Sequence, residues 1–183
     1  MRVIAGAFKG RHLHAPTWEG LRPTSDKLRE TLFNVLAVRV SGARVLDGFA
    51  GTGAVGIEAL SRGAARVAFV ERDRRAVALI RENLAVCGVA ADYTVEHREV
   101  GDALRSMPPD ALFDLIVLDP PYADGVEPAV LDAAARRLAV GGLLVLERPT
   151  RAQPDVPPSL MRVRDIKSGD STLTLLARAE EHT

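Results

Sequence analysis

The chain has 183 residues, of which 47% are hydrophobic and 26% charged, and its formal net charge is zero. This length fits one well-buried domain, so a ligand and a substrate must share most of one site. The composition is that of a soluble globular protein, the charge balance argues against a general polyanion binder, and no apolar run is long enough to span a membrane. Because the sequence has no secretory signal pattern, we expect a cytoplasmic protein.

The cysteine and histidine residues indicate little catalytic or metal chemistry. The single cysteine, Cys87, cannot form an internal disulfide, and it precedes Gly88 at the end of a predicted helix, where we expect it to pack. The four histidines show no metal-ligand spacing. No metal site is therefore predicted.

The chain begins with a segment that we expect to form an appendage, residues 1–40, ahead of the main domain, residues 41–183. Residues 1–5 and 11–14 are predicted to pair as a hairpin. Pro23 and Thr24 then open a helix, because apolar residues recur at helical spacing at Leu28, Leu32, Val35 and Leu36.

From residue 44 onward, short apolar runs alternate with helical segments, which indicates a parallel sheet with helices on both faces. After residue 146, a proline-rich stretch excludes another crossover helix, and Ser168-Gly169-Asp170 joins two strands as an antiparallel hairpin. We therefore predict an α/β fold, a doubly wound, seven-stranded, Rossmann-like sheet with a C-terminal antiparallel hairpin. The predicted strands are residues 44–49, 66–70, 93–98, 113–118, 143–146, 161–167 and 171–178.

A glycine-rich loop follows the first predicted strand. Residues 51–56 read Gly-Thr-Gly-Ala-Val-Gly and match the G-x-G-x-x-G fingerprint of dinucleotide-binding folds, and Glu71 lies twenty positions after Gly51. Such glycines let the backbone approach a ligand closely. By itself the loop fits NAD, S-adenosylmethionine or a tight strand-to-helix turn without a ligand.

The carboxylates around this loop favour a cationic ligand. In a doubly wound sheet, the strands that end at Asp47 and Asp119 become neighbours at the switch point where ligands bind, and Glu71 and Asp102 close the next strands. A diphosphate close to Asp47 would cost on the order of several kcal/mol in a partly dry crevice. S-adenosylmethionine carries a sulfonium and an ammonium against one carboxylate, so we predict this cofactor.

The fourth predicted strand ends in Asp119-Pro120-Pro121-Tyr122. Two prolines stiffen the backbone and leave carbonyl groups without local amide partners. The Asp119 carboxylate and the Pro120 carbonyl could then accept the two hydrogens of an exocyclic amine, while Tyr122 stacks on its base. The alternative is a rigid turn with a surface tyrosine.

Together these features resemble the amino-methyltransferases of the seven-strand class and, among them, the RsmD-type enzymes. The resemblance rests on residues 6–13, on Arg22-Pro23-Thr24-x-Asp26-x-x-Arg29-Glu30-x-Leu32-Phe33-Asn34, and on the segment from Phe49 to Gly63. It implies an enzyme that transfers a methyl group from S-adenosylmethionine to the N2 amine of a guanine in small-subunit ribosomal RNA.

The resemblance also implies roles for individual residues. Residues 47–53 would surround the methionine part of the cofactor, Glu71 would bind the ribose hydroxyls, and Asp102 with the backbone of Ala103 would contact the adenine edge. Asp119, Pro120, Pro121 and Tyr122 would hold the target guanine as the catalytic set. The predicted cofactor residues are Asp47, Phe49, Ala50, Gly51, Gly53, Glu71, Arg72, Asp102 and Ala103.

The appendage is expected to contact RNA phosphates. Residues 1–39 carry seven Lys or Arg against three Asp or Glu, a net charge of +4. Because no further domain is left to read sequence, we expect a monomeric enzyme whose partner is a shaped RNA within a partly or fully assembled small ribosomal subunit. The predicted contacts are Lys9, Arg11, Arg22, Thr24 and Arg29.

Other functions stay open on the residues alone. An adenine-N6 or protein glutamine methyltransferase shares the Pro-Pro-aromatic arrangement but usually has a larger recognition region, and a nicotinamide-dependent oxidoreductase would need a substrate domain. A non-catalytic RNA-binding assembly factor with the same fold is the alternative from a different class.

Overall fold

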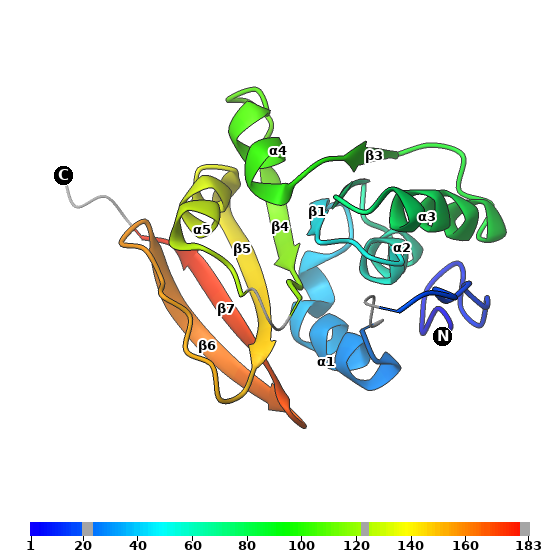
Figure 1. Ribbon diagram of the computed structural model, residues 1–183, viewed down its shortest axis with the longest axis horizontal. Coiled ribbons are helices and arrows are strands. Elements are labelled where there is room, and N and C mark those ends of the chain that lie inside the picture. Colours follow the sequence, from blue (N-terminus) through cyan, green and yellow to red (C-terminus); the bar gives the residue numbers. More distant parts are fainter. Residues whose placement is uncertain (20–23, 122–124, 180–183) are drawn as a thin grey trace.

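The computed structural model describes residues 1–19, 24–121 and 125–179, and a sheet of seven strands runs through its centre (Figure 1). The strand order is β3-β2-β1-β4-β5-β7-β6. The predicted α/β class and seven-stranded sheet with a C-terminal hairpin are therefore confirmed. The strands are β1 (Arg44–Gly48), β2 (Arg66–Glu71), β3 (Tyr93–His97), β4 (Phe113–Leu118), β5 (Leu138–Pro149), β6 (Leu160–Ser168) and β7 (Ser171–Arg178).

The first five strands run parallel, and β7 pairs antiparallel with both β5 and β6. Parallel strands are buried on both faces, which explains their nearly continuous apolar sequences. Successive side chains point to opposite faces, so Val45 lies in the core on one side of the sheet and Leu46 in the core on the other. Strand order reverses between β1 and β4, and this brings their carboxyl ends together at the switch point.

Helices cover both faces of the sheet (Figure 1). Helices α1, α2 and α3 pack into one core through Leu32, Ile57 and Ile80, while α4 and α5 pack into the other through Leu104 and Leu131. None of the helices in the described residues is long and apolar enough to cross a membrane. Their bounds are α1 (Asp26–Leu36), α2 (Ala54–Ser61), α3 (Arg74–Val86), α4 (Val100–Ser106) and α5 (Pro128–Ala135), with a 3-10 turn, η1 (Ala37–Arg39), after α1.

The two ends of the N-terminal strap, residues 1–14, pair as predicted. Arg2 bridges antiparallel to His12, and the backbone amides of Val3 and Leu13 donate to the carbonyls of Arg11 and Met1 at 2.9 and 3.1 Å. Beyond this short pairing, the backbone amides of Ile4 and Ala5 donate to the Glu58 carboxylate of α2, at 2.8 and 3.0 Å. The strap therefore closes on itself, and a side chain of α2 holds it against the sheet domain.

The strap, α1 and the sheet share one hydrophobic core. Val3 and Leu13 of the strap and Phe33 of α1 belong to the same buried cluster as Val45 of β1. Helix α1 begins at Asp26, because the hydroxyl of Ser25 accepts a hydrogen bond from the Leu28 amide and caps the helix. The segment that was predicted to be an appendage is therefore packed as part of the main body.

Candidate active site

The glycine loop leads from the end of β1 into α2. Phe49, Gly51 and Gly53 adopt left-handed backbone conformations, with φ of 59°, 55° and 76°, and Gly53 caps the start of α2. Gly56 is needed for a different reason, because a Cβ there would lie 2.2 Å from the ring of Phe69 in β2. The loop is thus shaped both to turn sharply and to bring α2 close to the sheet.

Asp47 lies buried at the end of β1, beneath this loop. Its Oδ2 atom accepts a hydrogen bond from the Gly56 amide at 2.8 Å. Burial raises the pKa of the Asp47 carboxyl to about 8, the negative charge of Glu71 adds to the rise, and the Gly56 amide opposes it. A carboxyl in this situation ionises more easily when a cation binds beside it.

Glu71, at the end of β2, ties the loop to its neighbouring strand. Its Oε2 atom accepts a hydrogen bond from the Gly51 amide, and its Oε1 atom accepts one from the Asp73 amide, both at 2.8 Å. A carboxylate has about four lone-pair positions, so each oxygen can still accept a hydrogen bond from a ligand hydroxyl. The side chain is thereby held in place at the edge where ribose hydroxyls are expected.

Asp119 follows β4, and a residue far away in the sequence contacts it. The Thr24 hydroxyl donates to its Oδ2 atom at 2.6 Å. Burial raises the pKa of Asp119 well above its ordinary value, and the nearby Glu147 carboxyl raises it further, while the Thr24 hydroxyl lowers it. Asp119 is thus positioned by the N-terminal part of the chain and electrostatically coupled to β5.

These groups line one cleft of about 470 Å³, within the range of roughly 300 to 1,000 Å³ that is usual for small-molecule sites. Sequence reasoning missed Trp18, Arg75, Glu147 and Ser171, which also line it. The Arg75 guanidinium lies 5.0 Å from the centre of the Trp18 ring, and both residues line the cleft. The predicted residues that the cleft brings together are Asp47, Phe49, Ala50, Gly51, Glu71, Arg72, Asp119, Pro120 and Pro121.

Two predicted adenine contacts are not part of this cleft. Asp102 lies in the first turn of α4, where its exposed carboxylate pairs with Arg105 at 2.8 Å. Ala103 is fully buried, and its amide donates within the helix to the carbonyl of Glu99. Both residues lie in the first half of α4, which begins at Val100 shortly after the end of β3, and their contact with adenine stays a prediction. Tyr122 lies outside the described residues.

The five predicted RNA contacts differ in where they lie. Lys9 is exposed, and Arg11 is exposed with one guanidinium nitrogen donating to the Val86 carbonyl at 2.8 Å. Thr24 faces Asp119 within the cleft, and its contact with RNA stays a prediction. Arg22 lies outside the described residues.

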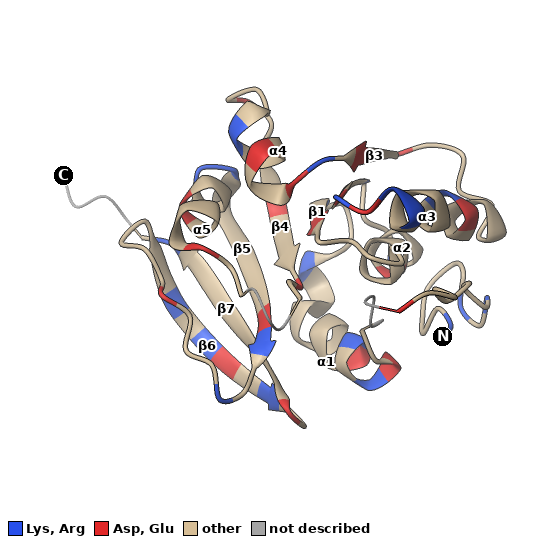
Figure 2. Cartoon of the chain, in the orientation of Figure 1, with Lys and Arg blue, Asp and Glu red and all other residues tan. Residues whose placement is uncertain are grey.

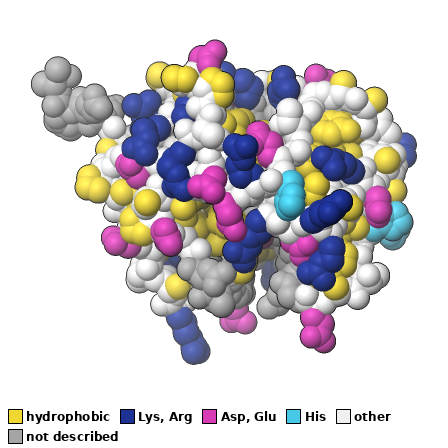
Figure 3. All heavy atoms as spheres, turned by 45° about the horizontal axis from the view of Figure 1, so that its top comes forward, with side chains coloured by type: hydrophobic (Ala, Val, Ile, Leu, Met, Phe, Trp, Pro, Cys, Tyr) yellow, Lys and Arg dark blue, Asp and Glu magenta, His cyan; other side chains and the backbone are white. Residues whose placement is uncertain are grey.

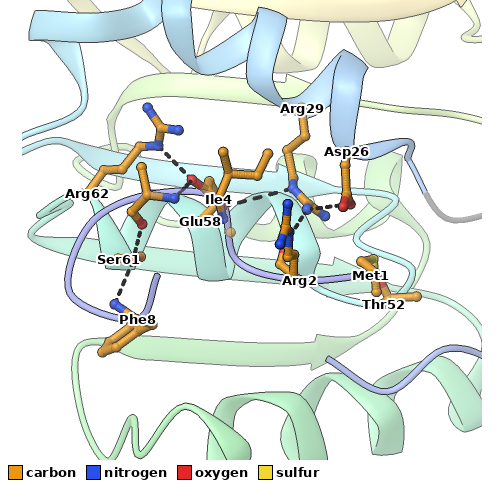
Figure 4. A network of polar contacts seen from close by, with 12 residues as sticks. Met1, Arg2, Ile4, Phe8, Asp26, Arg29, Thr52, Glu58, Ser61 and Arg62 are labelled. Atoms are coloured by element: carbon orange, nitrogen blue, oxygen red, sulfur yellow. Dashed lines mark hydrogen bonds and ion pairs between the residues drawn. The ribbon is translucent and has the colours of Figure 1, made fainter. Parts of the chain in front are cut away.

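Arg29 is completely buried, which corrects its expected role as an RNA contact. Its guanidinium donates to the Arg2 carbonyl at 2.5 Å and to Asp26 at 2.9 Å, and it lies 4.0 Å from the buried Glu58 carboxylate. Figure 4 shows Glu58 between this guanidinium and the strap, with Arg62 on its other side. Arg29 thus joins α1, α2 and the strap.

Charged side chains are mixed over the surface. Figure 2 shows both basic and acidic residues on α1, α3 and β6, and on the face in Figure 3 the basic side chains are interrupted by acidic ones. A surface that binds RNA would therefore contact phosphates at separate basic residues and would also depend on the shape of the RNA.

A comparison with protein families identifies the chain's relatives. The model of the family described as Conserved hypothetical protein 95 matches residues 1–177. The chain belongs to this family. The RsmD-type resemblance seen in the sequence is thereby confirmed, because the relatives with the most similar sequences include proteins named Ribosomal RNA small subunit methyltransferase D.

Three relatives show how far this family member resembles known proteins. The Ribosomal RNA small subunit methyltransferase D of Haemophilus influenzae is 40% identical over 123 residues, 67% of this chain and 64% of the relative. The tRNA (guanine(10)-N2)-dimethyltransferase of Methanothermobacter thermautotrophicus is 36% identical over 135 residues, 68% of this chain and 38% of the relative. A solved structure described as "Putative methyltransferase yhhF from Escherichia coli" is 34% identical, with a TM-score of 0.84 and 97% of both chains covered.

Proposed function

We propose that this family member transfers a methyl group from S-adenosylmethionine to the exocyclic N2 amine of a guanine in small-subunit ribosomal RNA. The observation that supports this most strongly is the position of Asp119 and Pro120 in the same acidic cleft as the glycine loop. Two relatives carry names that match the two halves of the proposal, ribosomal small-subunit RNA and guanine N2.

The cleft residues fit this cofactor. Asp47 is a buried carboxyl whose raised pKa falls when a cation binds nearby, and the ammonium and sulfonium of the cofactor are such cations. The loop from Phe49 to Gly53 would hold the methionine part, and Glu71 with Arg72 would hold the ribose. Asp102 and the backbone of Ala103 would contact the adenine edge, and Trp18 and Arg75 of the cleft are further residues available to the adenosine end. The cofactor supplies an electrophilic methyl group on sulfur.

The protein's part in the reaction is to orient the amine. The Asp119 carboxylate and the Pro120 carbonyl accept the two amine hydrogens, so that the nitrogen lone pair faces the methyl group. The cofactor would supply the methyl carbon to this nitrogen and keep the electron pair on sulfur, and Asp119 or water would take the proton that the amine releases. No covalent enzyme intermediate is involved, since Cys87 is buried and burial raises the pKa of its thiol.

The RNA partner would be met by a monomeric enzyme in the cytoplasm, within a partly or fully assembled small ribosomal subunit. Exposed Lys9 and Arg11, together with Arg22, are the proposed phosphate contacts. The enzyme would depend on RNA shape and on a target base that leaves its stack.

Purified small-subunit particles from cells that lack this protein provide the direct test. The wild-type protein and labelled S-adenosylmethionine should produce N2-methylguanosine, detected by mass spectrometry of the digested RNA, and Asp119→Ala should produce none. Cofactor binding is followed separately by calorimetry and by the fluorescence of Trp18, the chain's single tryptophan. Asp119→Ala should still bind the cofactor. A different methylated nucleoside, or binding of NADH in preference to the cofactor, would reject the proposal.

A further inference from the structure

Glu147 lies where the cleft meets a second hollow. It belongs to β5, its exposed fraction is 6%, and it lines both the cleft and an adjoining hollow of about 210 Å³. Pro120 and Pro121 also line both spaces. Glu147 therefore lies on the boundary between the proposed cofactor side and the space on the other side of the Asp119-Pro120-Pro121 corner.

The sheet places Glu147 next to Asp119. Leu118 of β4 pairs in register with Leu146 of β5, so Asp119 and Glu147 are the next residues along two parallel neighbours. Adjacent strands are separated by roughly 4.8 Å, and residues at the same register position point to the same side of the sheet. The two carboxyls consequently lie side by side at the end of β4 and β5.

Each of these carboxyls is oriented by a hydroxyl from another element. Thr24 donates to Oδ2 of Asp119 at 2.6 Å, and Ser171 of β7 donates to Oε1 of Glu147 at 3.1 Å. The Ser171 bond does not by itself require an acid, because a glutamine carbonyl would accept it as well. Two buried acids at adjacent positions are energetically costly. Here the two side chains hydrogen-bond each other, and a ligand with matching donors could take the place of that contact.

Guanine has such a pair of donors. Its Watson–Crick edge carries the N1–H next to the N2 amine, whereas adenine and cytosine place a ring-nitrogen acceptor next to their amine, and uracil has no amine. We propose that Glu147 accepts the N1–H of the target guanine while Asp119 and the Pro120 carbonyl hold the N2 amine. This inference rests on the proposed function, and it makes Glu147 the residue that selects guanine.

The two carboxylates would also exclude adenine. A carboxylate that accepts the guanine N1–H would instead face the lone pair of adenine N1, with no proton on the base between them. Sites that are built for a donor reject analogues without it strongly, because the buried acceptor is left unpaired. Glu147→Gln places a possible N–H donor at this position and should weaken the discrimination.

The test uses the small-subunit particle with the methylated position varied. The guanosine that the wild-type enzyme methylates is located first. Particles are then prepared with either guanosine or 2-aminopurine at that position. 2-Aminopurine keeps the amine and lacks the N1–H. The wild type should prefer guanosine in kcat/KM by about tenfold or more. In Glu147→Gln this preference should shrink at least about threefold, while calorimetric binding of S-adenosylmethionine stays as in the wild type.

Two controls separate base selection from other effects. Glu127→Gln changes an exposed carboxylate that lines the same second hollow, and it should keep the wild-type preference. The preference is also measured across pH. A change in the ionisation of Asp119 would alter the rates on guanosine and on 2-aminopurine alike. A change in base selection by Glu147 would alter the ratio of the two rates. If Glu147→Gln does not fold, as judged by circular dichroism, Glu147→Asp, which shortens the reach of the carboxylate, is measured against the same criterion.

The outcomes of the two proposals differ. Wild-type enzyme that methylates guanine N2 with no preference over 2-aminopurine, or a Glu147 variant with the full wild-type preference, would overturn the role of Glu147 and leave the proposed function intact. Wild-type enzyme that yields no N2-methylguanosine would overturn the proposed function itself.

Discussion

At the scale of single residues, the cleft is dominated by buried carboxyls from three neighbouring strands. Asp47 lies in β1, Asp119 directly follows β4 and Glu147 lies in β5, and burial raises the pKa values of the first two. Such groups destabilise a fold that has no cation to compensate them. The grouping of these carboxyls at the switch point lowers the stability of the fold. A cationic cofactor and an amine-bearing base would offset this loss.

Asp47→Asn should remove a pH dependence of stability. The folded pKa is about 8, above the value near 4 of an unfolded aspartate, so the folded state binds more protons between these pH values and stability falls as pH rises through this window. Above about pH 8 the wild type loses up to roughly 5 kcal/mol from this group. Asparagine keeps an oxygen for the Gly56 amide and avoids the charge.

Urea unfolding at pH 5.5 and pH 9 measures this effect. The free energy of unfolding of the cofactor-free wild type should decrease more between the two pH values than that of Asp47→Asn. Equal decreases in the two proteins would show that Asp47 already ionises near its ordinary pKa in the fold.

At the scale of elements, the strands were predictable because their apolar runs are continuous. The glycine loop was predictable because its glycines lie within a few residues of one another in the sequence. Glu147 was within reach of the same reasoning, since it follows the apolar run Leu143–Leu146 as Asp119 follows Phe113–Leu118. Its role depends on the pairing of β5 with β4, which no local pattern reveals. The contact of Thr24 with Asp119 and the burial of Arg29 against Glu58 likewise join segments far apart in the sequence.

The segment before α1 should influence catalysis through Thr24. Thr24→Val removes the hydroxyl that donates to Asp119, so kcat should fall roughly tenfold while the KM of the cofactor stays unchanged. Because this hydroxyl favours the ionised form, its loss should raise the pKa of Asp119 and move the rise of the pH–rate profile to higher pH.

Thr24→Ser provides the matched control, since it restores the donor and should restore both the rate and the profile. A Thr24→Val enzyme with wild-type kcat and an unshifted profile would show that the hydrogen bond has no part in orienting Asp119.

Helix α1 should depend on Arg29 for stability. Arg29→Ala leaves the buried Glu58 carboxylate without this guanidinium, which should cost roughly 3–5 kcal/mol in the free energy of unfolding. Lys27→Ala, at an exposed position of the same helix, should change it by less than about 0.5 kcal/mol. Chemical denaturation of both variants compares them, and a difference below about 1 kcal/mol would contradict the structural role of Arg29.

At the scale of the whole molecule, zero net charge coexists with a basic N-terminal part and an acidic cleft. The small cofactor and the RNA backbone carry opposite charges, and they would approach different regions of one compact body. The mixed surface in Figures 2 and 3 suggests that few phosphates are contacted.

RNA binding should therefore show a moderate dependence on salt. The affinity for small-subunit particles should fall linearly in a plot of log affinity against log salt, and Lys9→Ala or Arg11→Ala should each reduce the slope by about one. Filter binding at several salt concentrations measures this, with Arg66→Ala, an exposed residue of β2, as the control. If neither Lys9→Ala nor Arg11→Ala changed the slope, the RNA-binding surface would have to lie outside the strap.

The burial of Arg29 and Glu58 between strap, α1 and α2 has a consequence for protein engineering. Because the N-terminal third supplies part of the hydrophobic interior and orients Asp119, it cannot be exchanged among homologues as a detachable module. A chimera with altered RNA preference would have to import both members of the arginine–glutamate pair and the threonine together, or lose activity along with stability.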